Sequence, residues 1–144
     1  MRRDRSRRIP RPSSVKNTTP KSMQRITTVR TRATLAREAI ALMESEYATE
    51  LTLDDVARQI ATSRRQLQRC LDEHSDAPFR QCLTRIRMQR AAELLAETSI
   101  PVRDIAARVG YRQPAQFAKA FARAHGVPPT RYRAGRDRRF AAAA

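Results

Sequence analysis

The sequence has little of what several common classes of protein require. Its 144 residues include two cysteines, three isolated glycines and no tryptophan. Two cysteines do not make a disulfide framework in a chain of this size, and isolated glycines do not form a phosphate-binding loop. No apolar run approaches the roughly 20 residues that span a bilayer. We therefore expect no membrane association, and we expect Cys70 and Cys82 to be reduced and buried.

Side chains suited to catalysis or metal binding are also sparse. Cys70 and His74 lie four residues apart and could begin a metal site, but Cys82 and His125 do not provide a second pair with ligand spacing. Glu93 and Glu97 lie one helical turn apart but have no nucleophile or histidine beside them. The sequence therefore predicts a protein that is not an enzyme and that uses no cofactor and no metal.

Positive charge is abundant and unevenly distributed. Lys and Arg number 30 against 14 Asp and Glu, which gives a formal net charge of +16. Residues 1–33 hold 11 of the basic residues and one acid, whereas residues 34–144 have the mixed charges of a foldable domain. Such an excess favours polyanionic partners through counterion release and electrostatic steering. The composition therefore favours a nucleic acid as the partner.

The first 33 residues are poor in apolar side chains and contain Pro10, Pro12 and Pro20. This composition predicts a disordered basic arm. A signal peptide would need an apolar stretch here, and the prolines argue against the amphipathic helix of a transit peptide. We therefore expect a cytoplasmic protein, located at the nucleoid if it binds DNA.

The following residues predict a helix-turn-helix. Apolar residues recur at helical spacing over residues 34–47, which predicts a first helix. Thr52 with Asp55, and Ser63 with Gln66, then resemble two capping boxes, each at the start of a short amphipathic helix. Two short helices separated by a turn of three or four residues form a helix-turn-helix unit.

A long helix is predicted after Pro78, from Phe79 to about Glu97, and the earlier pattern then repeats. The corresponding segments are Asp55-Val56-Ala57 and Asp104-Ile105-Ala106 at an offset of 49, then Leu67 and Phe117, Leu71 and Phe121, and Pro78 and Pro128 at an offset of 50. The change of offset predicts a second helix-turn-helix whose turn is one residue longer and contains Gly110. Pro114 suits the first position of its second helix.

The expected fold is all-α, with about seven helices in two helix-turn-helix subdomains joined by a long linker helix. The expected division is a disordered basic arm (1–33), a first subdomain (34–78), the linker helix (79–98), a second subdomain (99–134) and a flexible basic and alanine-rich tail (135–144).

The second helix of each unit carries candidate DNA-binding side chains. On the first, Arg65 and Gln68 lie opposite the apolar face; Arg can bond guanine twice, and Gln can do the same with adenine. On the second, Ala115 offers only a methyl group, which leaves base contact and backbone contact both open. The candidate residues are Ser63, Arg64, Arg65, Gln68, Arg69, Arg112, Gln113, Ala115, Gln116 and Lys119.

The stretch from about Leu51 to Arg133 resembles the DNA-binding domain of the AraC/XylS family of bacterial transcription regulators. The motifs that carry the resemblance are Leu53-Asp54-Asp55-Val56-Ala57, Ser63-Arg64-Arg65-Gln66-Leu67-Gln68-Arg69, Arg85-Ile86-Arg87-Met88-Gln89-Arg90-Ala91-Ala92-Glu93-Leu94-Leu95, Val109-Gly110-Tyr111 and Gly126-Val127-Pro128-Pro129-Thr130-Arg131-Tyr132-Arg133. The resemblance implies two recognition helices, held by a rigid linker helix, that enter successive major grooves.

Three positions depart from the family pattern. Leu71 stands where the family usually has Phe, and Asp76 replaces the usual Gly at the end of the first recognition helix. Pro114-Ala115 replaces a polar pair at the start of the second. We expect a smaller first core, a strained or differently capped turn at Asp76, and weaker base discrimination by the second recognition helix.

About 50 residues precede the first helix-turn-helix, so the chain resembles the family's short single-domain members and is expected to lack a small-molecule effector domain. The expected partner is double-stranded DNA, bound by a monomer at an asymmetric site, with RNA polymerase as a candidate protein partner. Two alternatives remain open. One is a nonspecific nucleic-acid-compacting protein that binds through the basic arm, and the other is a protein-interaction module of the transcription machinery.

Overall fold

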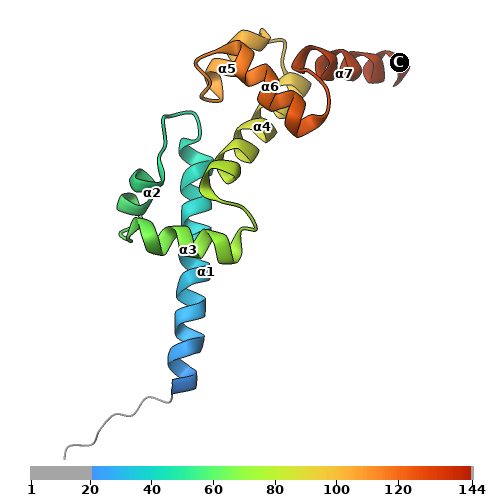
Figure 1. The fold of residues 1–144 in the computed structure, drawn as a ribbon. Helices are drawn as coiled ribbons and strands as arrows, with labels where there is room; N and C mark the ends of the chain where they lie inside the picture. Colours follow the sequence, from blue (N-terminus) through green and yellow to red (C-terminus); the bar gives the residue numbers. More distant parts are fainter. Residues whose placement is uncertain (1–20, 144) are drawn as a thin grey trace, which may run out of the picture.

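The computed structural model describes the backbone of residues 21–143 and the side chains of residues 31–139 and 141–143. All regular secondary structure in this part is helical (Figure 1). The helices are α1 (Lys21–Glu46), α2 (Leu53–Gln59), α3 (Arg64–His74), α4 (Phe79–Glu97), α5 (Val102–Arg108), α6 (Pro114–His125) and α7 (Pro129–Ala143). The predicted all-α class is confirmed. None of these helices combines the length and apolar character needed to cross a membrane.

The helices form two units connected by α4 (Figure 1). In the first unit α3 packs on α1 and α2, and in the second α6 packs on α5 and α7. Each unit has its own apolar core: Leu67 and Leu71 lie in the first, and Phe117 and Phe121 lie in the second, all fully buried. The linker α4 contributes to both cores, so burial of its apolar side chains holds the two units on one helix.

The predicted repeat is visible in the helix boundaries and in the turns. Helix α5 begins 49 residues after α2, and α6 begins 50 residues after α3. Both first helices end in a Schellman motif: the amide of Thr62 donates to the carbonyl of Ala57, and that of Tyr111 to Ala106, at 2.9 Å in each case. The left-handed residue of this motif is Ala61 in one unit (φ 55°) and Gly110 in the other (φ 94°).

The caps of the first unit agree only partly with the prediction. Thr52 and Asp55 form the complete capping box: the Asp55 carboxylate accepts from the Thr52 amide at 3.0 Å and from its hydroxyl at 2.6 Å. These bonds lower the pKa of Asp55. Ser63 accepts from the Gln66 amide at 3.1 Å, but the Gln66 side chain accepts from the Thr62 hydroxyl instead of from the Ser63 amide. The second box is therefore half formed.

Two helices are longer than the sequence predicted. Helix α1 begins at Lys21 rather than at Thr34, so it includes residues 21–33, which the sequence assigned to the arm; the rest of the predicted arm lies outside the described residues. All three arm prolines precede Lys21, and the Arg32 guanidinium donates to both carboxylate oxygens of Glu73 on α3, at 3.1 and 3.2 Å. Helix α1 therefore contains no proline, and the ion pair between Arg32 and Glu73 joins it to α3.

Helix α7 likewise continues to Ala143, through most of the segment 135–144 that was predicted to be a flexible tail. One Arg136 nitrogen donates to the carbonyls of Leu95 and Ala96, and to that of Thr98 at 3.3 Å. These carbonyls lie at the end of α4 and lack partners within that helix. Arg136 therefore caps α4 from α7 and fixes the first half of the predicted tail as a helix.

Helices α3 and α6 are followed by different residues in the same left-handed backbone conformation. Gly126 closes α6 in the left-handed conformation at φ 77°, and the corresponding residue after α3, Asp76, adopts φ 53°. Aspartate tolerates this region better than most residues other than glycine, at some cost in backbone strain. The expected strain at Asp76 is therefore present in the first unit.

Candidate nucleic-acid interface

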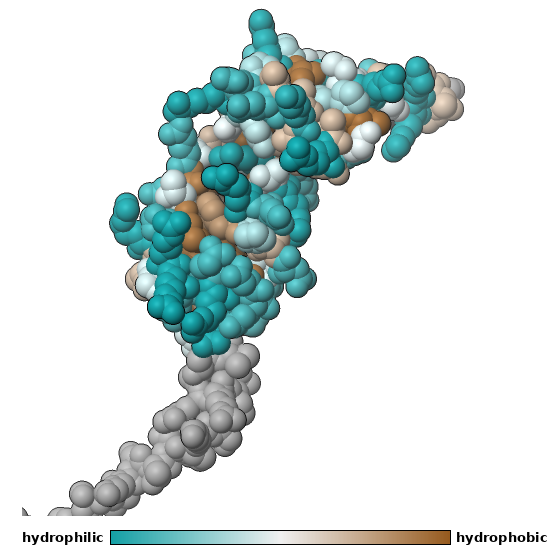
Figure 2. Space-filling model, in the orientation of Figure 1, coloured by the Kyte–Doolittle hydropathy of each residue, from teal (hydrophilic) through white to brown (hydrophobic). Residues whose placement is uncertain are grey.

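Helix α3 presents a basic and amide-bearing surface because its apolar residues are all on the other side. Leu67, Cys70 and Leu71 are fully buried, whereas Arg65 and Arg69 are exposed. Figure 2 shows that hydrophilic residues cover most of the face on which α3 lies. The inward assignment of the three apolar residues and the outward assignment of Arg65 and Arg69 therefore agree with the structure, whereas Gln68 is only half-exposed and His74, assigned inward, is exposed.

Two of the predicted contact residues on α3 are held by nearby acids. The Gln68 amide donates to Asp72 at 2.9 Å, and the Arg64 guanidinium lies 3.0 Å from the Asp54 carboxylate on α2. Exposed pairs of this kind contribute about 0–1 kcal/mol, so a base or a phosphate can displace the acid at little cost. Among the described residues, no acid is paired with Arg65 or Arg69, whose guanidinium groups therefore remain available to an anion.

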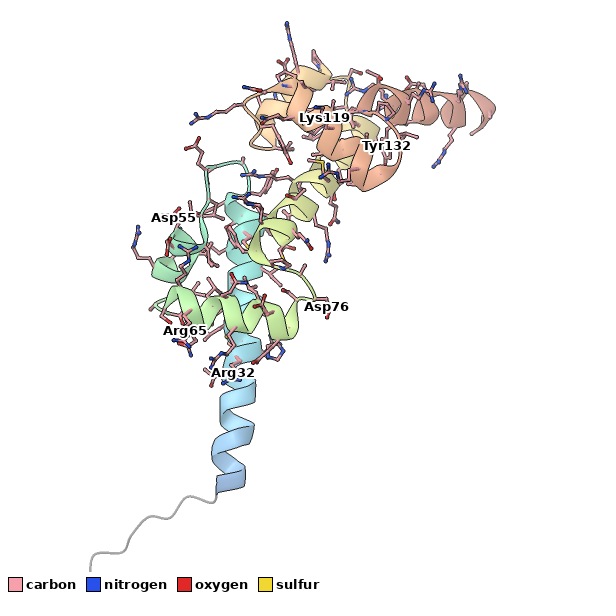
Figure 3. All side chains as sticks on the ribbon, in the orientation of Figure 1. Arg32, Asp55, Arg65, Asp76, Lys119 and Tyr132 are labelled. Carbon is pink, nitrogen blue, oxygen red and sulfur yellow. The ribbon has the colours of Figure 1, made fainter. Side chains whose placement is uncertain are left out.

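Helix α1 adds a basic residue that the sequence analysis missed. Arg32 lies beside α3 and lines a shallow hollow with the N-terminal part of that helix (Figure 3). The other lining residues are Ser63, Arg65, Gln66 and Arg69. A sequence signal for Arg32 existed: Ala36, Ala39 and Met43 form the buried stripe of α1, and the same spacing reaches Arg32 one turn earlier.

Helix α6 presents the second set of predicted residues. Phe117 and Phe121 are fully buried and their rings lie 5.9 Å apart, so the remaining side of the helix faces outward. Gln113, Ala115, Gln116 and Lys119 are all exposed, and Pro114 occupies the first turn as predicted. Figure 3 shows Arg65 and Lys119 in different units of the molecule, so the chain has two separate candidate surfaces.

Arg112 is placed differently from the other predicted residues. It lies in the α5–α6 turn and forms an ion pair with Glu50, which precedes α2, and both side chains are exposed. The pair therefore joins the loops of the two units rather than extending the surface of α6. Within the described residues, no group of three or more His, Cys, Asp or Glu side chains has the arrangement of a metal site.

Comparison with known proteins places this arrangement in a familiar class. The family model described as a helix-turn-helix domain matches residues 56–135. The HTH-type transcriptional activator RhaS of Escherichia coli O139:H28 (strain E24377A / ETEC) is 34% identical over 98 residues, which cover 68% of this chain and 35% of RhaS. This chain thus spans about a third of the length of that curated relative.

Solved structures show the same fold. The C-terminal domain of AraT, a response regulator from Geobacillus stearothermophilus, is 38% identical and superposes with a TM-score of 0.68, covering 71% of this chain and 85% of that one. The DNA-binding domain of AdpA, a global transcriptional factor solved in complex with a target DNA, is 26% identical with a TM-score of 0.68, covering 72% of this chain and 94% of that one.

Proposed function

The chain belongs to the AraC/XylS family of helix-turn-helix proteins, and from this premise we propose that it is a transcription regulator that binds a specific double-stranded DNA sequence. In this proposal α3 and α6 enter successive major grooves on one side of the DNA, about 34 Å apart. A single chain then reads two different half-sites, so it binds an asymmetric site as a monomer.

The observation that carries the proposal is that α3 and α6 occupy equivalent positions in the two helix-turn-helix units. Helices α3 and α6 each follow a Schellman turn, bury two large apolar residues and expose a polar side. A second helix held in this way, after a first helix and a turn, is the arrangement that places side chains in a major groove. The two units lie on one rigid linker helix, which favours simultaneous contact with two grooves.

The two recognition helices are proposed to contribute different chemistry. On α3, Arg65 and Gln68 have the donors that read guanine and adenine, and Arg69 and Arg32 are suited to phosphates. On α6, the exposed amides and Lys119 can contact bases or phosphates, while Ala115 can pack only against a thymine methyl. We therefore assign most of the base discrimination to α3 and most of the backbone contact to α6.

Selection from a random double-stranded DNA pool at physiological salt tests this assignment. The wild-type chain is compared with Gln68→Ala on α3 and Gln116→Ala on α6, and Gln81→Ala at an exposed position of α4 is the matched control. We expect two enriched half-sites, with Gln68→Ala relaxing one position of the first at a cost of about 1–3 kcal/mol. Tight binding without enrichment would contradict the proposal and favour nonspecific compaction, and absence of binding would favour a protein-interaction module.

A further inference from the structure

Arg87 lies near the middle of α4, at the point where the linker helix changes from one core to the other. Cys82 and Leu83, before it, pack in the first core, and Met88 and Ala91, after it, pack in the second. Arg87 is itself half-buried, and this burial lowers the pKa of its guanidinium. An arginine remains charged in proteins in spite of such a shift, so a half-buried charge lies at the junction of the units and is stabilised by partners there.

The guanidinium finds its first partners at the end of α1. Its Nε donates to the carbonyl of Tyr47 at 2.8 Å, and its Nη2 donates to the carbonyl of Thr49 at 2.9 Å. Tyr47 directly follows the last residue of α1, where helix carbonyls lack partners and the helix dipole favours a cation. Because α1 packs against α3, these bonds join the linker to the support of the first recognition helix.

The other side of the guanidinium contacts the turn before α6. Its carbon lies 5.8 Å from the centre of the Tyr111 ring, within the range of a cation–π contact. A Cβ added at Gly110 would lie 3.1 Å from both the Cζ and the Nη2 of Arg87. The Tyr111 ring in turn packs edge-on against Phe117 of α6 at 5.7 Å. One side chain of α4 therefore touches the segments that support both recognition helices.

Two further contacts cross the same junction. The Tyr47 side chain packs against both apolar cores, and Glu50 pairs with Arg112. The Arg87 guanidinium differs from these contacts because it donates hydrogen bonds to two backbone carbonyls. A planar group with directed donors holds two segments at a defined distance and angle, which an exposed ion pair between flexible side chains cannot do.

We propose that Arg87 is a positioning residue that sets the separation and relative orientation of α3 and α6, and that it thereby determines which spacing between two DNA half-sites the protein accepts. The DNA part of this inference rests on the proposed function. Arg87 contacts no DNA in this scheme. Its effect is on the geometric match between two linked binding surfaces, and simultaneous binding is lost when that match fails.

The test measures affinity for duplexes whose selected half-sites are moved closer together or farther apart by one and two base pairs. The variants are Arg87→Met, which removes the donors but keeps an apolar side chain, and Arg87→Lys, which keeps the charge but not the planar fork. Arg85→Met, at an exposed position on the same helix, is the matched control. Thermal unfolding and affinity for a single half-site establish that each variant is folded.

We expect the wild type and Arg85→Met to favour one spacing by about tenfold or more, and we expect both Arg87 variants to reduce this preference to about threefold or less. Affinity for a single half-site should stay within about twofold, because neither recognition surface is altered. An unchanged spacing preference in folded Arg87→Met would overturn the inference, as would an equal loss of affinity at every spacing.

A measurement without DNA separates this inference from the proposed function. Spin labels at Arg58→Cys on α2 and Arg123→Cys on α6, both exposed positions, report the distance between the units, while Cys70 and Cys82 are buried and protected from labelling. Arg87→Met should broaden this distance distribution, and Arg85→Met should leave it narrow. A narrow distribution in Arg87→Met would refute the positioning role. A wild type with no preferred spacing but a broadened Arg87→Met distribution would refute the proposed function and the DNA part of the inference, and would support the positioning role of Arg87.

Discussion

Replacing Gly110 by alanine and Ala61 by glycine makes opposite changes at equivalent positions of the two helix-turn-helix units. Both residues occupy the left-handed position of a Schellman turn, at φ 94° and φ 55° respectively. The surroundings differ: Ala61 is exposed, whereas a Cβ at Gly110 would lie 3.1 Å from the Arg87 guanidinium and from the carbonyl oxygen of Tyr47. The two substitutions should therefore change the free energy of unfolding in opposite directions.

The magnitudes follow from backbone strain and packing. In Gly110→Ala the left-handed backbone costs about 1–2 kcal/mol, and crowding against Arg87 and Tyr47 adds about 1–3 kcal/mol. In Ala61→Gly a strain of about 1–2 kcal/mol is relieved, but the greater freedom of glycine in the unfolded chain offsets about 0.4–1 kcal/mol. The same entropy term offsets about 0.4–1 kcal/mol of the cost in Gly110→Ala. We therefore expect a loss of about 1–4.5 kcal/mol for Gly110→Ala and a gain of about 0–1.5 kcal/mol for Ala61→Gly.

Urea unfolding followed by circular dichroism measures both changes in the free energy of unfolding. In thermal unfolding, each kcal/mol should move Tm by about 2–4 °C in a chain of this size. Gly135→Ala is the control, since Gly135 lies within α7 and a Cβ there would meet nothing within 4 Å. That change should stabilise the protein by about 0.5–1 kcal/mol. A neutral Gly110→Ala variant, or a destabilised Ala61→Gly variant, would refute the reasoning.

Other expected outcomes concern caps, base reading and the arm. Thr52→Ala should lower the free energy of unfolding, measured in urea at pH 7, by about 1 kcal/mol. Because the Thr52 bonds lower the pKa of Asp55, the difference in this free energy between the variant and the wild type should shrink as pH falls through that lowered pKa. Arg136→Met should destabilise α4 and α7 by about 1–3 kcal/mol, because the α4 carbonyls lose a charged donor. Gln68→Ala should change base preference at one position in binding assays and leave the salt dependence unchanged. Removing residues 1–20, with seven basic residues and one acid, should weaken binding to all DNA sequences alike and flatten the salt dependence.

Features that depend on neighbouring residues could be predicted from the sequence. The repeat placed both helix-turn-helix units, and its change of offset located the longer turn at Gly110. The boundaries of α4, Phe79 and Glu97, were also predicted, since Pro78 and the break at Thr98 are local signals. The outward sides of α3 and α6 followed from the spacing of their apolar residues, and the candidate contact residues are exposed except Gln68, which is half-buried; their contact with DNA stays a prediction.

Features that depend on distant contacts could not be predicted. The early start of α1 is accompanied by the Arg32 ion pair with Glu73, 41 residues away, and the extension of α7 by the bonds from Arg136 to α4. In a sequence with many arginines, no local pattern indicates which arginine will donate to a distant carbonyl or carboxylate. Arg87 is the clearest example of a role that could not be predicted. The sequence placed it only within the motif of the linker helix, whereas its partners, the carbonyls of Tyr47 and Thr49, lie in the first unit.

Protection of guanine N7 from methylation on a selected duplex is the most direct test of the claim that one chain reads two successive major grooves. The N7 atom lies in the major groove, where a recognition helix would cover it. We expect two protected blocks on one side of the DNA, with centres about 10 base pairs apart, and weaker guanine N7 protection in only one block for Arg65→Ala. A single protected block, or tight binding without N7 protection, would contradict it.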